Sequence, residues 1–133
     1  MNIVDPSVVC GTNVDIGHFT VIEANVKIGN DVKIGHRVTI HEGTIIGDGV
    51  TIADGAVLGK PPKPAKTSTV KLSDELPPLV IGDHCTIGAN AVVYRGATIG
   101  AYTLIADLAS VRENVHIGQY VIVGRGVCVE NHV

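Results

Sequence analysis

Hydrophobic and polar residues alternate along this chain with a period of six. Groups of six run without interruption from Val4 to Val57, which gives nine hexads, and nine more run from Ile81, the last one residue short. The first residue is aliphatic in every hexad except at Cys10, and the fifth is always Val, Thr, Ala or Cys. Because a period of six does not keep one face of a helix with about 3.6 residues per turn, the pattern predicts short strands joined by turns.

The same period predicts how the strands stack. We expect the first residue of each hexad to point inward and the small fifth residue to pack near a corner. Gly at the second position would allow special backbone torsions and close approach. Three hexads then close one triangular coil, and stacked coils pair as parallel strands about 4.8 Å apart. The predicted fold class is all-β, a parallel β-helix of about six coils forming a single domain over residues 1–133.

The composition agrees with a core made of thin layers. The chain is 45% hydrophobic but has no Trp, one Phe and one Met, so Ile and Val must supply most of the core. A net charge of -3 gives no reason to expect nucleic acid or an anionic membrane surface as a partner. No apolar run reaches the roughly 18 residues of a membrane span, and residues 1–5 do not read as a signal peptide. We interpret Cys10, Cys85 and Cys128 as reduced core thiols of a cytoplasmic protein.

The repeat is broken once, between Leu58 and Val80. These 23 residues equal one hexad plus a 17-residue insertion, so we expect the coil to continue beneath an extruded loop. Most of the prolines lie here, and a long loop in a compact domain is usually functional or disordered. Lys60, Lys63 and Lys66 suit a phosphate-bearing ligand such as CoA or a nucleotide sugar. We expect this loop to cover a site or to hold a neighbouring subunit; a plain surface excursion is the alternative.

Polar residues collect on one side of the predicted prism. Residues 18 apart lie on adjacent strands, which sorts the second hexad positions into three columns, and two of these are dominated by Gly or Ala. A surface without function would scatter its substitutions, so we expect the functional site along the third column, on the side from which the loop leaves. That column contains Asp5, Glu23, His41, Gly59, Tyr94, Arg112 and Glu130.

Two histidines in this region are candidate catalytic residues. Glu23 and His41 are expected to be neighbours one coil apart, where a carboxylate holds an imidazole in one tautomer, as a general base requires. His36 lies just before a corner, with His18 one coil below it and Asp54 one coil above. We predict His41, Glu23 and His36 as catalytic residues, with solvated surface histidines as the alternative interpretation.

These motifs resemble the hexapeptide-repeat family, whose pattern is an aliphatic residue, often Gly, two variable residues, a small residue and one more. The resemblance covers about 107 of the 133 residues. It implies a left-handed β-helix, which is an exception to the usual right-handed crossover, and a homotrimer. It also implies an acyltransferase that moves an acetyl or other acyl group from acetyl-CoA or an acyl carrier protein. The acceptor would be an amino or hydroxyl group, as on a nucleotide-linked sugar.

One feature of that resemblance is missing from this chain. In several sugar acyltransferases of the family, the base is a His at the third position of a hexad such as IxHxC. The corresponding position here is Glu113. Some sugar N-acetyltransferases of the family need no strong protein base, because a neutral amine attacks the thioester itself. The resemblance therefore implies the activity without supplying the base, and His41 stays our candidate.

Two other functions are compatible with the sequence. The stretch around "IGHRVTIHEG" resembles the gamma-class carbonic anhydrases, in which histidines at these two hexad positions bind zinc between facing subunits. His36 and His41 match those positions, and Glu23 falls where the third ligand is expected, whereas Gly17 replaces a Gln of that branch. A zinc hydratase using His36, His41 and Glu23 is thus one alternative. A non-catalytic trimeric scaffold is the other.

The last hexad is one residue short, and no capping segment follows it in the sequence. An exposed final coil would leave strand edges and an apolar cross-section open. We therefore expect either that the chain is truncated at this point or that another subunit covers the end.

Overall fold

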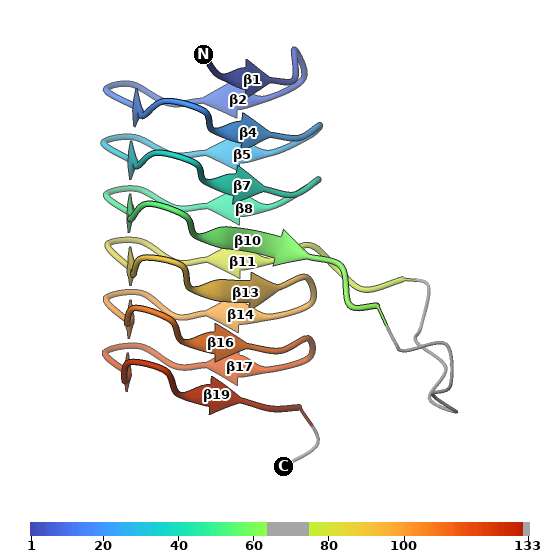
Figure 1. Cartoon of the computed structure of the whole chain (residues 1–133), viewed down its shortest axis with the longest axis vertical. Helices are drawn as coiled ribbons and strands as arrows, with labels where there is room; N and C mark the ends of the chain where they lie inside the picture. The colour runs from blue at the N-terminus through green and yellow to red at the C-terminus, as the bar shows by residue number, and fades with distance from the viewer. Residues whose placement is uncertain (64–74, 132–133) are drawn as a thin grey trace.

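The computed structural model describes residues 1–63 and 75–131, and these form a stack of short parallel strands. Figure 1 shows coils piled along one axis, with the two chain ends at opposite ends of the stack and a loop leaving from its middle. Three sheets form the walls of a left-handed parallel β-helix of about six coils, which confirms the predicted fold class. The described residues include no helix that is long and apolar enough to cross a membrane.

Each coil contributes a strand to each sheet in turn. The first sheet contains β1 (Ile3–Val4), β4 (Val21–Ile22), β7 (Thr39–Ile40), β10 (Val57–Lys60), β13 (Val92–Tyr94), β16 (Ser110–Val111) and β19 (Cys128–Val129). The second sheet contains β2 (Val9–Cys10), β5 (Lys27–Ile28), β8 (Ile45–Ile46), β11 (Val80–Ile81), β14 (Thr98–Ile99) and β17 (His116–Ile117). The third sheet contains β3 (Asp15–Ile16), β6 (Lys33–Ile34), β9 (Thr51–Ile52), β12 (Thr86–Ile87), β15 (Leu104–Ile105) and β18 (Ile122–Val123).

Two of the three edges of the prism matter for function. The loop edge is the corner between the first and second sheets; it carries Glu23, His41 and the long loop. The histidine edge is the corner between the third and first sheets, and it carries His18 and His36. Side chains on different edges of one prism are separated by the core.

Strand pairing confirms the period of 18 and the length of the insertion. Val21 pairs with Thr39 in a parallel register, 18 residues apart. Across the loop, Ile46 pairs with Ile81, which is 35 residues further along the chain, or one coil of 18 plus the predicted 17. The prism therefore continues in register beneath the loop.

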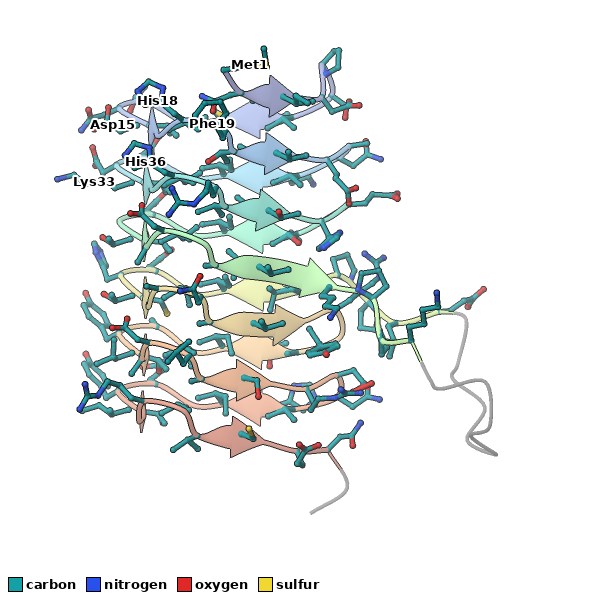
Figure 2. All side chains as sticks on the ribbon, in the orientation of Figure 1. Met1, Asp15, His18, Phe19, Lys33 and His36 are labelled. Carbon is teal, nitrogen blue, oxygen red and sulfur yellow. The ribbon has the colours of Figure 1, made fainter. Side chains whose placement is uncertain are left out.

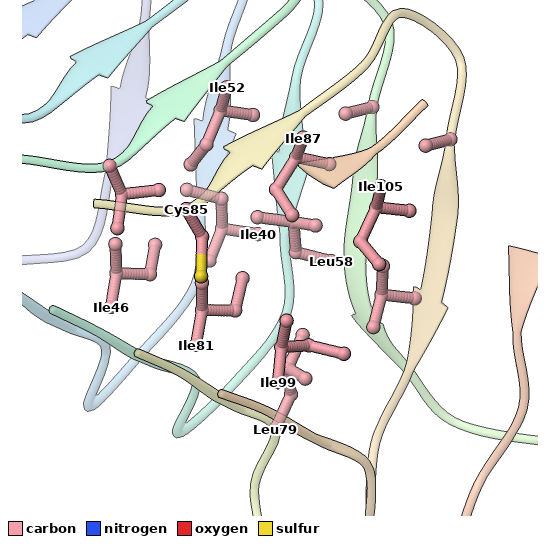
Figure 3. Packing of buried hydrophobic residues seen from close by; sticks show 14 of the residues in the cluster. Ile40, Ile46, Ile52, Leu58, Leu79, Ile81, Cys85, Ile87, Ile99 and Ile105 are labelled. Carbon is pink, nitrogen blue, oxygen red and sulfur yellow. The ribbon is translucent and has the colours of Figure 1, made fainter. Parts of the chain in front are cut away.

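The interior is built from the first and fifth hexad positions, as the pattern predicts. Figure 3 shows rows of Ile side chains from successive coils packed against one another. Cys85, at a fifth position, is fully buried among them. The prediction of core thiols was wrong for the other two cysteines, since Cys10 and Cys128 are exposed. Cys10 lies in the first coil, which has a neighbouring coil on one side in this chain, and Cys128 occupies a sixth position that faces outward.

The second position needs Gly for close approach rather than for unusual torsions. A Cβ built on Gly82 would lie 2.8 Å from the backbone nitrogen of Ala101 in the next coil, a distance that real Cβ atoms do not show. The left-handed backbone falls instead at the fourth position, where Arg37 has φ 54° and Leu108 has φ 63°. The part of our prediction that placed special torsions at the second position is corrected accordingly, because the chain turns the corner two residues later.

The loop begins later than the break in the pattern suggests. β10 runs to Lys60, and a bulge at Gly59 (φ 76°) shifts the register so that Lys60, not Gly59, pairs with Tyr94. On the return, Leu79 is completely buried in the prism. Residues 58–60 and 79–80 thus belong to the coil, and the excursion leaves from the loop edge, as predicted (Figure 1).

Candidate functional site on the loop edge

The polar second-position residues that the sequence predicts in one column do lie along the loop edge, with one exception. Because of the bulge, Lys60 takes the place that the sequence register assigned to Gly59. Carboxylates and a histidine lie on the coils on one side of the loop, and Tyr94, Arg112 and Glu130 lie on the other. The edge is therefore acidic on the N-terminal side of the loop and mixed in charge beside and beyond it, where Lys60 and Arg112 lie with Glu113 and Glu130.

The structure brings Glu23 and His41 into direct contact. His41 Nδ1 lies 3.0 Å from Glu23 Oε1, and the same oxygen accepts a hydrogen bond from the backbone N–H of Glu42 at 3.1 Å. An ionised Glu23 can only accept, so this contact places a proton on Nδ1 of His41 and leaves Nε2 with a lone pair. Among the described residues, Nε2 makes no hydrogen bond, and the side chain is 24% exposed. This is the tautomer that a general base needs.

A hollow of about 380 Å³ lies beside this pair. Its lining combines apolar side chains, including Ile3 and Val21, with the carboxylates of Asp5, Glu23 and Glu42. No Lys or Arg is among its lining residues in the described part of the chain.

Asp5 is held as a carboxylate at the rim of the hollow. Its Oδ1 accepts hydrogen bonds from the Ser7 hydroxyl at 2.7 Å and from the Ser7 backbone N–H at 2.9 Å. These two bonds, the hydroxyl first, lower the pKa of Asp5 below its ordinary value. The rim therefore stays negatively charged at neutral pH.

A second cluster lies on the other side of the loop. The Arg112 guanidinium lies over the Tyr94 ring, 4.3 Å from its centroid, and Lys60 Nζ lies over the same ring at 5.6 Å. Arg112 Nε and Nη2 donate to the two carboxylate oxygens of Glu113 at 2.8 and 3.3 Å. The hydrogen bond to Glu113 raises the pKa of Arg112 above its ordinary value. Arg112 is thus permanently charged and fixed in place.

Glu113 does not occupy a catalytic position in this structure. Its side chain is 3% exposed and is turned against Arg112, whereas a base that acts on a substrate must reach it. The residue at the position of the family's His therefore serves to hold Arg112.

Arg95 attaches the returning limb of the loop to the prism. Its Nε donates to the carbonyl of Leu76 at 3.0 Å, and its Nη1 donates to the carbonyl of Glu42 at 2.8 Å. A Cβ on Gly96 would lie 3.2 Å from Leu76, and one on Gly43 would lie 3.4 Å from Pro78, so the limb packs closely on the corner. Sequence analysis missed Arg95, because nothing in the hexad pattern distinguishes this third-position residue.

His36 lies apart from His41, on the histidine edge. Its Nδ1 accepts the backbone N–H of His18 at 2.8 Å, and the two rings stack with centroids 5.3 Å apart (Figure 2). This bond repeats a pattern in which third-position side chains accept the N–H of the residue one coil before. The other acceptors in that pattern are Asn30, Asp48, Asp54, Asp83 and Asp107.

Within one chain, the structure therefore joins two of the three predicted catalytic residues and separates the third. His36 performs a structural task that does not involve the loop edge. The alternative zinc site requires His36 and His41 to come from two facing subunits. Within residues 1–63 and 75–131 of a single chain, no three His, Cys, Asp or Glu side chains are grouped to hold a metal ion.

The predicted phosphate-binding lysines have different outcomes. Lys60 is placed on Tyr94 by the bulge, and Lys63 is exposed at the start of the loop. Lys66 lies outside the described residues.

Comparison with known proteins identifies the class. The family model "Bacterial transferase hexapeptide (six repeats)" matches residues 25–60 and 78–111, more than half of the chain. The chain belongs to this hexapeptide-repeat transferase family. A sequence comparison with curated proteins gives no match.

Solved structures share the fold. The acetyltransferase domain of PglB from Neisseria gonorrhoeae, in complex with acetyl coenzyme A, is similar with a TM-score of 0.75 and 18% identity, over 91% of this chain and 50% of that one. A variant of GDP-perosamine N-acetyltransferase from Caulobacter crescentus, with CoA and GDP-perosamine, gives 0.69 and 20% over 96% and 50%. WeeI from Acinetobacter baumannii gives 0.61 and 24% over 97% and 55%. The chain thus spans about half the length of these proteins.

Proposed function

We propose that this protein is an acyltransferase that moves an acetyl group from acetyl-CoA to an amino or hydroxyl group of a small molecule, with a sugar as the favoured acceptor class. Its membership of the hexapeptide-repeat transferases supports the reaction type. The complexes of similar proteins with CoA thioesters and an amino sugar support the substrate classes. The observation that carries the proposal is the hydrogen bond between His41 Nδ1 and Glu23 on the loop edge.

His41 is the proposed general base. Its Nε2 takes a proton from the acceptor nitrogen or oxygen as that atom forms a bond to the thioester carbonyl carbon. The carbon–sulfur bond then breaks, and the departing thiolate takes up a proton to give free CoA. Glu23 acts as a positioning residue, because it keeps the proton on Nδ1 and stabilises the imidazolium that forms.

The donor is proposed to lie across the loop edge with its phosphates toward Lys60 and Arg112. Lys60 and Arg112 flank Tyr94 there, and Lys63 and Lys66 follow Lys60 along the loop. We expect a homotrimer in which the site lies in the groove between two prisms. Holding the thioester and the nucleophile in one groove supplies much of the rate by orientation alone.

The test is release of free thiol from acetyl-CoA in the presence of a panel of amino and hydroxyl acceptors. His41→Gln should lower kcat by about 10²- to 10⁴-fold, the usual contribution of a general base. Glu23→Gln keeps a side-chain oxygen but removes the charge, and should lower kcat by about tenfold or more.

His84→Asn is the matched control. His84 is exposed at a corner away from the loop edge and has φ 58°, a conformation that Asn adopts readily. This variant should keep full activity. Equal activity of the His41 variant and the control would reject His41 as the base, and the absence of thiol release with any acceptor would reject the transferase proposal.

A further inference from the structure

We infer that the acceptor is an amine that carries no phosphate, and that Asp5 and Glu42 are specificity-determining residues that exclude phosphorylated or nucleotide-linked acceptors. This inference rests on the proposed function, since it concerns the acceptor of the same reaction. The inference removes nucleotide-linked sugars from the acceptors that the proposed function allows.

The position of the hollow makes it the acceptor side of the site. Glu23 both lines the hollow and binds His41 Nδ1, so a molecule in the hollow contacts the residue that positions the candidate base, although His41 itself is not a lining residue. At about 380 Å³ the hollow is within the size range of small-molecule pockets. Its wall of Ile3 and Val21 offers an apolar surface of the kind that covers the carbon skeleton of a small ligand.

The charges of the hollow decide which acceptors fit. Asp5, Glu23 and Glu42 place three carboxylates on its lining, with no lining Lys or Arg among the described residues. Like charges brought together in a binding site repel one another, so a phosphate in this hollow is disfavoured. An ammonium group is attracted by the same three carboxylates, and its proton leaves by way of His41, the proposed base.

The nearby cations are engaged elsewhere. The Arg95 guanidinium donates to the carbonyls of Leu76 and Glu42 and does not line the hollow. Lys60 and Arg112 lie on Tyr94, on the other side of His41 along the edge, where we place the donor phosphates. We therefore place the anionic donor and the cationic acceptor at separate ends of one edge, and no Lys or Arg of the described residues lines the hollow to pair with a phosphorylated acceptor.

The experiment compares matched acceptors in the thiol-release assay with acetyl-CoA. Each pair is a free amine and its phosphate ester or nucleotide-linked form, with glucosamine and glucosamine 6-phosphate as the first pair. We expect kcat/KM to be at least about tenfold higher for the free amine. In Asp5→Asn/Glu42→Gln this preference should shrink to about threefold or less. Asn at position 5 retains an oxygen that accepts from Ser7, so the corner should be preserved.

The control is Asp15→Asn/Asp31→Asn, which removes the same charge from exposed residues away from the loop edge. It should keep the preference of the unaltered protein. Faster reaction of the phosphorylated member, or an equal loss of preference in the control, would overturn the inference while leaving the transferase proposal intact. No thiol release with any pair would instead overturn the proposed function itself.

Equilibrium binding of the same pair by titration calorimetry, without donor, gives a readout that is independent of turnover. We expect the free amine to bind more tightly to the unaltered protein, and tighter binding of the phosphate ester would count against the inference.

Discussion

Several bulky residues at the fourth hexad position adopt a strained backbone conformation that a single substitution can relieve. Leu108 has φ 63° and is 66% exposed, so burial of its side chain does not offset the strain of its left-handed conformation. Non-glycine residues lose about 1–2 kcal/mol in this region, and Asn tolerates it best. We expect Leu108→Asn to raise the free energy of unfolding by about 1 kcal/mol, measured from urea unfolding.

Ile122→Asn is the comparison variant for this prediction. Ile122 is also a highly exposed aliphatic residue, at 74%, but it lies in a strand with an ordinary backbone. It should gain no stability. A similar gain in both variants would mean that removal of exposed apolar surface, not relief of the backbone, is responsible.

The sequence predicts the inner positions of the hexad better than its corners. Ile and Val at the first position and Gly at the second are frequent enough to reveal the inward side chain and the close approach, as at Gly82. The left-handed fourth position also has a signal, since Asn, Asp or Gly fills more than half of these positions, but residues as different as Arg37, Tyr102 and Leu108 fill others and obscure it. At these less favourable residues the backbone strain is offset by packing of the whole coil, which cannot be predicted from the conformational preference of a single residue.

At the level of elements, the attachment of the loop depends on one arginine. Arg95 links the Leu76 carbonyl of the returning limb to the Glu42 carbonyl of the neighbouring coil. Arg95→Gln cannot span both carbonyls, so we expect the limb to open more often. Cleavage after Glu75 by a Glu-specific protease should become at least about tenfold faster, because each net hydrogen bond contributes about 1 kcal/mol or more.

Arg125→Gln provides the control for that measurement. Arg125 is exposed, and no hydrogen bond from its side chain is present among the described residues. The rate of cleavage after Glu75 should be unchanged in this variant. An unchanged rate in Arg95→Gln as well would show that packing on Gly43 and Gly96 alone holds the limb.

The length and exit point of the loop follow from the sequence, but its junction does not. Counting residues between Leu58 and Val80 gives the 17-residue insertion that strand pairing confirms. The bulge that carries Lys60 onto Tyr94 depends on Gly59 adopting φ 76°, and a Gly at the second position looks the same whether or not it bulges. The hexad pattern therefore could not predict the contact between Lys60 and Tyr94.

At the scale of the whole molecule, the coil period is what brings the site together. Glu23 and His41 are 18 residues apart, and one turn of the prism puts them in contact, so their pairing was predicted from the sequence alone and is confirmed. The hollow beside them was not predicted, because its lining comes from side chains of several coils whose directions depend on the corner geometry. The same period places His36 on another edge, which explains why the histidines at 36 and 41 do not meet within one chain.

The continuous core also predicts how the three thiols behave. Cys85 is buried and its Sγ lies 3.0 Å from the Gly100 carbonyl, whereas Cys10 and Cys128 are exposed. Burial raises the pKa of the Cys85 thiol above its ordinary value of 9.0, so at pH 8 this thiol is both covered and protonated. A chromogenic disulfide reagent should therefore modify two thiols rapidly in the native protein and the third only after unfolding in urea. Three rapid equivalents in the native protein would contradict this assignment.

The raised pKa also gives the stability a definite dependence on pH. A group whose pKa is higher in the folded state favours folding below its unfolded pKa, and this contribution is lost as the pH rises through the folded pKa. For Cys85 the loss should begin above about pH 9, where the thiol of the unfolded chain ionises. Between pH 8 and pH 10 the urea midpoint should fall more in the unaltered protein than in Cys85→Ala, which has no thiol to ionise at this position. Cys128→Ser, which removes an exposed thiol, should show the same fall as the unaltered protein, and a fall of equal size in Cys85→Ala would place the titrating group elsewhere.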